Sequence, residues 1–131
     1  MDNCIFCKIV AGQIPCAKVY EDKDTLAFLS IGPVHKGHVL VIPKKHHRWL
    51  WDVPAAESKE LMPKLQKIAK AVEKATRCDL VVMTVVGDEV AHAHIHLIPK
   101  FHGDGLKFWP EGKYAEGEME EWRRKVEQAL K

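Results

Sequence analysis

Three histidines alternate with small or apolar residues between Val90 and Ile98, where the chain reads Val-Ala-His-Ala-His-Ile-His-Leu-Ile. Successive side chains of a β-strand point to opposite faces, so His92, His94 and His96 are predicted to share one face while apolar residues cover the other. An imidazole can bind a metal, attack an electrophile, donate to a phosphate or carry a proton near neutral pH. The spacing therefore predicts a row of chemically active side chains above an apolar face.

The histidine row alone is also compatible with a catalytic metal. Two histidines separated by one residue on a strand can share a zinc ion, and a catalytic zinc adds a third protein ligand and an open position for water. Nothing in the strand excludes such a zinc-dependent hydrolase. A single histidine on a strand is usually structural, but three in alternation favour a functional role.

A pair of thiols two residues apart lies near the N-terminus, at Cys4 and Cys7. Such a pair binds zinc or acts as a redox motif, but a thioredoxin-like motif follows a strand and only three residues precede Cys4. A closed zinc site needs two more ligands, for which His46 and one member of the histidine row are the candidates. Two thiolates and two neutral imidazoles leave no open position, which is typical of a structural site. The other histidines then remain free for metal-independent chemistry.

Composition predicts one domain spanning residues 1–131. The chain has 131 residues, of which 47% are hydrophobic and 29% charged, and its net charge of +2 gives no case for nucleic acid or an anionic membrane as partner. The segment Lys44–Trp51 mixes basic with aromatic residues but is predicted to be a solvated loop. No apolar run reaches the length of about 18 residues that a membrane span needs, and the N-terminus lacks the features of a secretory signal. We therefore expect a cytoplasmic protein whose four cysteines, including Cys16 and Cys78, are not in disulfides.

Strand and helix signals alternate along the chain and predict an α+β fold. Runs rich in β-branched residues between polar or Gly/Pro turns are typical of strands. Five segments qualify: Lys18–Glu21, Leu26–Leu29, His38–Ile42, Leu80–Val86 and the histidine segment. The first two are separated by a polar turn and suggest a hairpin.

Three helices are expected around these strands. A short helix spans Cys4–Val10, and a long one begins at the N-cap Asp52 and runs to about Thr76, with a kink or a later start at Pro63. The long helix has one apolar stripe, formed by Leu61, Leu65, Ile68 and Val72. A second stripe predicts a closing helix packed on the sheet, through Met119, Trp122, Val126 and Leu130.

Three motifs in order give the chain a resemblance to the histidine triad family of nucleotide hydrolases and transferases. They are Cys-Ile-Phe-Cys-Lys-Ile-Val-Ala-Gly-Gln-Ile-Pro at 4–15, Gly-His-Val-Leu-Val-Ile-Pro-Lys-Lys-His at 37–46 and His-Ala-His-Ile-His-Leu-Ile-Pro at 92–99. Together they span most of the chain and are more specific than an isolated His-x-His-x-His. The chain is most similar to the zinc-containing bacterial and archaeal branch. The resemblance implies a five-stranded antiparallel sheet, a homodimer, and hydrolysis or transfer at the α-phosphate of a nucleoside phosphate derivative.

The resemblance also implies a role for each histidine. His94 attacks the α-phosphorus and forms a nucleotidyl-histidine that water cleaves, which suits an imidazole whose ordinary pKa of about 6.5 leaves it largely neutral at pH 7. His96 donates to a nonbridging phosphate oxygen, and His38 supports this arrangement from a neighbouring strand. The remaining motif residues are implied to be ligands of a structural Zn²⁺: Cys4, Cys7, His46 and His92.

The implied nucleotide pocket departs from the family pattern. An apolar slot for the base corresponds to Ile5, Phe6, Phe28, Leu29 and Ile31, which could equally be ordinary core residues. Ser30 stands where an aspartate usually holds the ribose hydroxyls, and Thr84 lies near an expected asparagine. Two acids, Asp88 and Glu89, precede the triad and would repel a phosphate unless they point outward. The departures concern the substrate and leave the triad intact.

The sequence thus favours a nucleotide phosphoramidase or hydrolase of the histidine triad type. Two alternatives belong to other classes. A nucleotide-binding or regulatory protein would keep the fold but turn over little substrate, and a zinc-dependent hydrolase would use the histidine row as metal ligands. The pattern assigns no role to Cys16, Cys78 or Trp109.

Overall fold

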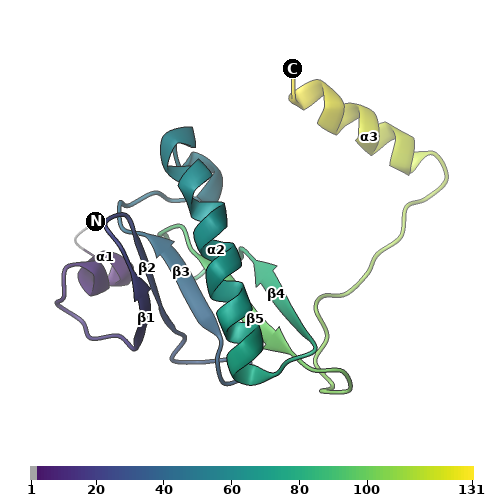
Figure 1. The fold of residues 1–131 in the computed structure, drawn as a ribbon. Coiled ribbons are helices and arrows are strands. Elements are labelled where there is room, and N and C mark those ends of the chain that lie inside the picture. Colours follow the sequence, from purple (N-terminus) through teal and green to yellow (C-terminus); the bar gives the residue numbers. More distant parts are fainter. Residues whose placement is uncertain (1–2) are drawn as a thin grey trace.

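The computed structural model describes residues 3–131, and Figure 1 shows its arrangement. Five strands and three α-helices follow one another with one short 3₁₀ helix. In chain order they are α1 (Ile5–Val10), β1 (Lys18–Glu21), β2 (Thr25–Leu29), β3 (Val39–Pro43), η1 (Leu50–Asp52), α2 (Ala55–Thr76), β4 (Leu80–Thr84), β5 (Ile95–Lys100) and α3 (Glu118–Ala129).

The strands form one five-stranded sheet in the order β1-β2-β3-β5-β4, and every neighbouring pair is antiparallel. This confirms the expected α+β fold with an antiparallel sheet. Strand β3 lies at the centre and is buried along its whole length, as its unbroken apolar sequence requires. It pairs with β5 through Val41 and Ile95, which brings the histidine segment beside the segment that contains His38.

Each face of the sheet carries its own core. On one face, α2 buries its predicted stripe of Leu61, Leu65, Ile68 and Val72 against alternate residues of the strands, among them Val41 and Ile95 (Figure 1). On the other face, Phe6 of α1 packs with a second set formed by Leu26, Phe28, Leu40 and Ile42. The period-two alternation of the strands thus separates an α2 face from an α1 face.

The histidine segment is only partly a strand, which corrects the prediction that all three histidines share one. Strand β5 begins at Ile95, so that His92 and His94 lie in the segment before it and only His96 is within the strand. The physical reason is a competing hydrogen bond: the Ala93 amide donates to the His47 carbonyl at 2.7 Å instead of joining the sheet. The segment therefore leaves the strand pairing with β3, although the His92 side chain still bonds to the carbonyl of Pro43 at the end of that strand.

The long helix starts later than Asp52. Leu50–Asp52 form the 3₁₀ turn η1, and α2 begins at Ala55 after Pro54 as N-cap. The helix continues through Pro63, so the alternative of a start at that proline is wrong. Within residues 3–131, no helix is both long and apolar enough to cross a membrane.

The C-terminal helix does not close the sheet, and that prediction is wrong. Residues 101–117 form a long extended arm between β5 and α3. Figure 1 shows α3 at the end of this arm, away from the sheet and from α2. Its apolar stripe is exposed, with Trp122 at 49% and Leu130 at 83% of full exposure. The spacing of apolar residues predicted the helix and its apolar face, but it carries no information about which surface that face contacts.

Candidate functional site

Two thiols and two imidazoles meet beside the first turn of α1. Cys4 is the N-cap of α1, and its sulfur accepts a hydrogen bond from the Cys7 amide at 3.3 Å. One helical turn separates these residues, which puts the two sulfurs on the same side. His46, which follows β3, and His92 complete the group, and one ligand atom from each residue lies within 4.8 Å of all the others.

Hydrogen bonding fixes which ring nitrogen of His92 faces the thiols. A carbonyl oxygen can only accept, so Nε2 of His92 carries the proton that it donates to the Pro43 carbonyl at 2.8 Å. In the neutral ring, Nδ1 then has a lone pair, and it lies 3.4 Å from Cys4 Sγ and 3.5 Å from Cys7 Sγ. His46 presents its own Nδ1 at 3.3 Å from Cys7 Sγ. Burial lowers the pKa of His92, which favours the neutral form that a metal requires.

The spacing of these atoms fits a zinc ion. Tetrahedral zinc with Zn–S of about 2.3 Å and Zn–N of about 2.0–2.1 Å separates sulfur from nitrogen by about 3.5 Å. The nitrogen-to-sulfur distances of 3.3–3.5 Å agree with this geometry. Burial and the adjacent Cys4 sulfur raise the pKa of Cys7 to about 11, because two thiolates side by side repel each other in the absence of a cation. A divalent ion among the four groups would reverse this preference, so the donor set fits zinc both in geometry and in charge.

His94 presents an unprotonated nitrogen to its surroundings. Its Nδ1 lies 2.7 Å from the His92 carbonyl, so Nδ1 carries the proton and Nε2 carries the lone pair of the neutral ring. The ring of Phe6 packs edge-on against it at 5.0 Å between centroids, and the ring of His96 lies at 5.1 Å. His94 is thus held in one tautomer and one orientation, which is what a nucleophilic imidazole needs.

His38 and His96 form a chain of hydrogen bonds whose direction is determined by a backbone amide. The Val34 amide donates to Nδ1 of His38 at 3.1 Å, so His38 in its neutral form carries its proton on Nε2. This Nε2 donates to Nδ1 of His96 at 3.0 Å, which leaves His96 with a proton on its outer nitrogen. Burial lowers the pKa of His38, and burial with the neighbouring His94 and His38 lowers the pKa of His96 to about 4. His96 is therefore a neutral hydrogen-bond donor next to the His94 ring.

The residues predicted to form a base slot do not all lie together. Phe6 and Phe28 are buried in the core on the α1 face, where their rings contact edge to face at 5.5 Å. Leu29 is adjacent to Phe28 in a strand and points to the opposite face, where it lines a groove beside α2, so the structure separates it from Phe6 and Phe28. Ile5 is 42% exposed, and Ile31 is fully exposed in the loop after β2.

Of the other predicted pocket residues, Ser30 and Thr84 lie beside His38 and His96, and the two acids of the loop are exposed to solvent. The Ser30 amide donates to the His38 carbonyl at 2.9 Å, which places Ser30 next to the hydrogen-bonded pair. Thr84 ends β4 directly opposite His96 in the strand register. Both acids of the loop, Asp88 and Glu89, are exposed. Exposure to solvent weakens their repulsion of a phosphate, since surface charges are screened.

Sequence reasoning missed the backbone groups that set the tautomers and one aromatic contact. The Pro43 carbonyl and the Val34 amide have no side-chain signal that could have revealed them. The contact joins Trp49, whose ring stacks on Trp51 at 4.9 Å, to Gly87 in the loop before the triad. Gly87 has a positive φ of 71°, a conformation that glycine adopts more easily than other residues. A glycine in the loop before the triad was therefore the one sequence signal that could have indicated this tight approach.

We expect Gly87→Ala to destabilise the protein. A Cβ at Gly87 would lie 2.5 Å from the Trp49 ring, which is held by its stack on Trp51. Gly103→Ala is the matched control, because Gly103 also has a positive φ but has nothing within 4 Å of its Cβ position. Urea unfolding should show a loss of about 1–3 kcal/mol for Gly87→Ala beyond that of Gly103→Ala, from overpacking alone. Equal losses in the two variants would contradict the close contact.

The free energy of unfolding should decrease in mild acid, and we expect His96 to cause part of this decrease. Its pKa is lowered to about 4 in the folded chain, whereas an unfolded histidine has a pKa of about 6.5. The unfolded chain therefore binds a proton first, and the contribution that is present above pH 6.5 is lost as the pH falls toward about 4. Urea titrations of the parent and of His96→Asn should show a smaller pH slope for the variant over this range. Both proteins keep the four candidate metal ligands, so metal release cancels in the comparison, and equal slopes would refute the assignment.

Comparison with known proteins places this geometry in a family. The family model described as the HIT domain matches residues 11–103, a range that contains His38, His94 and His96 but begins after the two thiols of the cluster. An adenosine 5'-monophosphoramidase of Schizosaccharomyces pombe is 40% identical over 99 residues, which are 75% of this chain and 74% of that protein.

Solved structures agree with the family match. A crystal structure from Streptococcus mutans covers 100% of this chain and 87% of its own, with a TM-score of 0.89 and 37% identity. A zinc-bound histidine triad family protein from Mycobacterium smegmatis has a TM-score of 0.73 and 34% identity, with 86% of this chain and 85% of that chain covered. The chain belongs to the HIT domain family.

Proposed function

We propose that the protein hydrolyses or transfers the nucleotidyl group of a nucleoside phosphate derivative, through a covalent intermediate on His94. The observation that carries the proposal is the 2.7 Å hydrogen bond from His94 Nδ1 to the His92 carbonyl, which leaves the lone pair on Nε2. Attack of this nitrogen on the α-phosphorus forms a nitrogen–phosphorus bond and breaks the bond to the leaving group. Water then cleaves the nucleotidyl-histidine and returns His94 to its starting state.

His96 is proposed to stabilise the transition state and His38 to position it. The outer nitrogen of His96 carries a proton, and the ring of His94 lies 5.1 Å from that of His96. A nonbridging phosphate oxygen gains negative charge as the His94 nitrogen attacks, and a positioned donor is worth about 10²–10³ in rate at such an oxygen. His38 fixes the tautomer of His96 through their 3.0 Å hydrogen bond, and the Val34 amide fixes the tautomer of His38.

The substrate class is proposed from the name of a relative and from the residues near His38. The relative from S. pombe is named as an adenosine 5'-monophosphoramidase, which supports a phosphoramidate as substrate. A dinucleotide belongs to the same proposed class, because it also carries a leaving group on the α-phosphorus. Ser30, whose backbone amide bonds to the His38 carbonyl, has a hydroxyl that can bond to a ribose, although it lacks the second oxygen of a carboxylate. We therefore expect Ser30 to bind the ribose hydroxyls more weakly than an aspartate would.

Cys4, Cys7, His46 and His92 are proposed to hold a structural zinc ion. The four donors fill a tetrahedral shell without an open position, so the ion would stabilise the fold and would not bind substrate. It would tie α1 to the segment before β5, and thereby help to fix the His92 carbonyl that orients His94.

We further propose a homodimer, supported by the edge strand β4 with its half-exposed apolar residues. A cytoplasmic location is also proposed, supported by four cysteines that form no disulfide.

Incubation of the zinc-loaded protein with adenosine 5'-phosphoramidate tests the function directly. We expect release of ammonia and adenosine monophosphate, and a rapid alkaline quench should capture a protein that carries one adenylyl group. Peptide mapping should locate that group on His94. Tight binding of the nucleotide without product, across several leaving groups, would instead support a regulatory binding protein.

A second measurement separates the proposal from zinc-dependent hydrolysis. Brief chelation at low temperature, where the domain stays folded by circular dichroism, should leave most of the turnover intact. Loss of turnover in a fully folded, metal-free protein would show that a metal takes part in the reaction. That result would overturn the role of His94 as a metal-independent nucleophile.

A further inference from the structure

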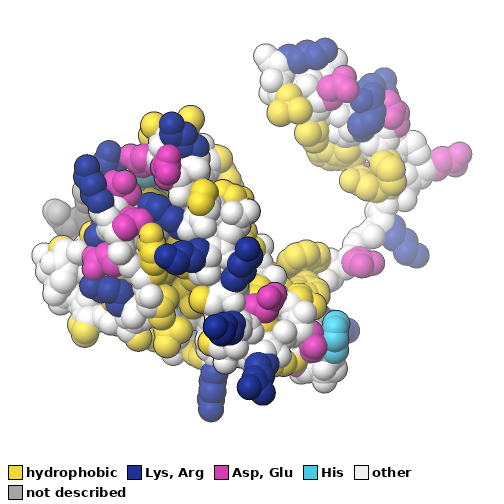
Figure 2. Space-filling model, viewed as in Figure 1, with side chains coloured by type: hydrophobic (Ala, Val, Ile, Leu, Met, Phe, Trp, Pro, Cys, Tyr) yellow, Lys and Arg dark blue, Asp and Glu magenta, His cyan; other side chains and the backbone are white. Residues whose placement is uncertain are grey.

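The C-terminal helix has an apolar face with nothing of its own chain against it. Four apolar side chains at helical spacing share that face, and Figure 2 shows hydrophobic side chains gathered along one side of the detached helix. They are Met119, Trp122, Val126 and Leu130, which are between 49% and 83% exposed. A helix of 12 residues is marginally stable in water by itself, so α3 needs a surface to cover this stripe.

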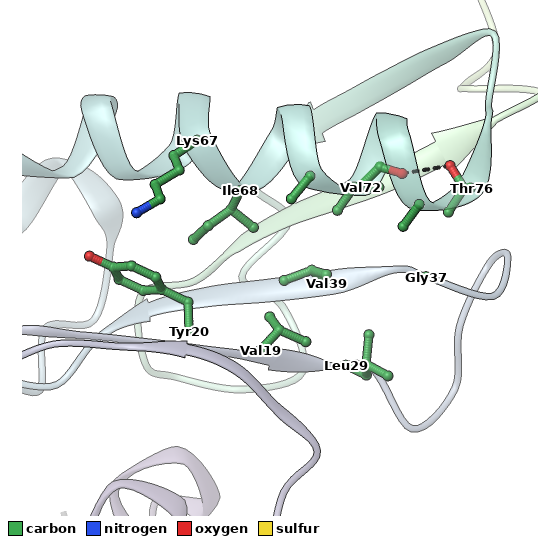
Figure 3. Close-up of a pocket in the computed structure, with 11 residues that line it drawn as sticks. Val19, Tyr20, Leu29, Gly37, Val39, Lys67, Ile68, Val72 and Thr76 are labelled. Atoms are coloured by element: carbon green, nitrogen blue, oxygen red, sulfur yellow. Dashed lines mark hydrogen bonds between the residues drawn. The ribbon is translucent and has the colours of Figure 1, made fainter.

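The body of the protein carries an apolar groove that is open to solvent. A cavity of about 270 Å³ lies between the second half of α2 and strands β1 to β3 (Figure 3). Its walls include Val19, Leu29, Ala71 and Val72, of which only Val72 is buried. The groove and the stripe on α3 are thus two exposed apolar surfaces on one small chain, and monomeric proteins rarely leave such patches uncovered.

Charges of opposite sign lie beside the two surfaces. Lys67 lies at the rim of the groove, with its ammonium 5.8 Å from the centre of the Tyr20 ring. Figure 2 shows more Lys and Arg side chains over the same region of the molecule. The first turn of α3 is acidic, with Glu118, Glu120 and Glu121. Glu120 pairs with Arg123 and Glu121 with Lys125 on the same helix, so Glu118 is the acid that can face a lysine of the groove.

The root of the arm directs α3 away from its own groove. Lys100 is almost fully buried, and its ammonium binds the Asp104 carboxylate at 2.9 Å and the Leu106 carbonyl at 3.2 Å. Asp104 also accepts from the Leu106 amide at 2.8 Å and pairs with His35 at 3.1 Å. These bonds fix the first residues of the arm, and in Figure 1 the chain then runs past β4 while the groove lies toward β1 and β2.

We infer that α3 of one copy docks in the α2–β1 groove of a second copy, and that the second copy returns the same contact. Twofold symmetry doubles the contact, because each copy offers both a helix and a groove. The crystal structure from S. mutans aligns over the whole chain, so the aligned part includes α3 and the arm that carries it. The exposed outer edge of β4 lies on the side toward which the arm runs, so the same second copy can approach there.

Isotope-filtered NMR on a mixed sample tests the inference. Equal amounts of methyl-labelled and unlabelled full-length protein are mixed, and nuclear Overhauser effects are recorded between Ala71 or Val19 methyls of one copy and the Trp122 indole of another. We expect such effects between copies. Effects only within one chain, no effect at all, or a monomer by sedimentation would each overturn the inference.

Charge substitutions provide a second test with matched controls. Trp122→Glu on the stripe and Ala71→Glu on the exposed wall of the groove should each raise the dimer dissociation constant at least tenfold. Gln128→Glu on the opposite face of α3 and Ala56→Glu at the other end of α2 add the same charge and should have little effect. A 1:1 mixture of the two disruptive variants should form heterodimers more tightly than either variant forms homodimers, since one arm and one groove remain intact. No preference for the heterodimer would contradict exchange between copies.

Discussion

Removal of zinc is expected to lower the melting temperature of the protein by about 10–20 °C without unfolding it at low temperature. A ligand present at about 1,000 times its dissociation constant stabilises the folded state by about 4 kcal/mol, and a domain of this size loses several degrees for each kcal/mol. The loss should be limited because both faces of the sheet have their own apolar core, and the candidate zinc ligands Cys4 and His92 pack on the α1 side. Differential scanning calorimetry with and without a chelator measures the shift.

Two single substitutions make the zinc prediction specific. Cys7→Ser should reproduce the effect of the chelator and abolish any further effect of it, because Cys7 lies within 3.5 Å of both imidazoles of the cluster. Cys78→Ser is the matched control, since this half-buried thiol lies outside the cluster and should keep the parent's response. A melting temperature that is insensitive to both chelator and Cys7→Ser would rule out a structural metal at this site.

The sequence allowed the prediction of features that depend on local periodicity or on short spacing. The four-and-three spacing of Leu61, Leu65, Ile68 and Val72 predicted the face of α2 that is buried. The two-residue gap between Cys4 and Cys7 predicted neighbouring sulfurs, because one helical turn separates the residues. Both features are decided within a few residues, where tertiary contacts have little influence.

The features that the sequence did not reveal depend on backbone groups or on distant surfaces. His92 and His94 leave the strand because the Ala93 amide bonds to the His47 carbonyl, a partner that no periodicity encodes. The separation of Leu29 from Phe28 could have been predicted, since adjacent strand residues point to opposite faces. The position of α3 could not have been predicted, because an apolar stripe indicates that the helix makes a contact but does not indicate which surface it contacts.

Replacement of His94 by glycine is expected to lower turnover of adenosine 5'-phosphoramidate by at least about 10³-fold, because removal of a covalent nucleophile costs more than removal of a single positioned donor. The variant should keep its fold, since the four candidate zinc ligands and the hydrogen bond between His38 and His96 do not involve the His94 ring. No adenylyl group should be captured on the variant protein.

Free imidazole in solution gives the His94 prediction its sharpest test. An external imidazole can occupy the space vacated by the His94 ring beside Phe6 and attack the same phosphorus, so turnover should recover in proportion to its concentration. His102→Gly is the control, because His102 is exposed and lies after β5, outside the histidine cluster. That variant should turn over substrate like the parent and gain nothing from imidazole. If His94→Gly kept the parent's rate, the nucleophile would have to be another group, and the tautomer argument from the His92 carbonyl would describe only the structure of the site.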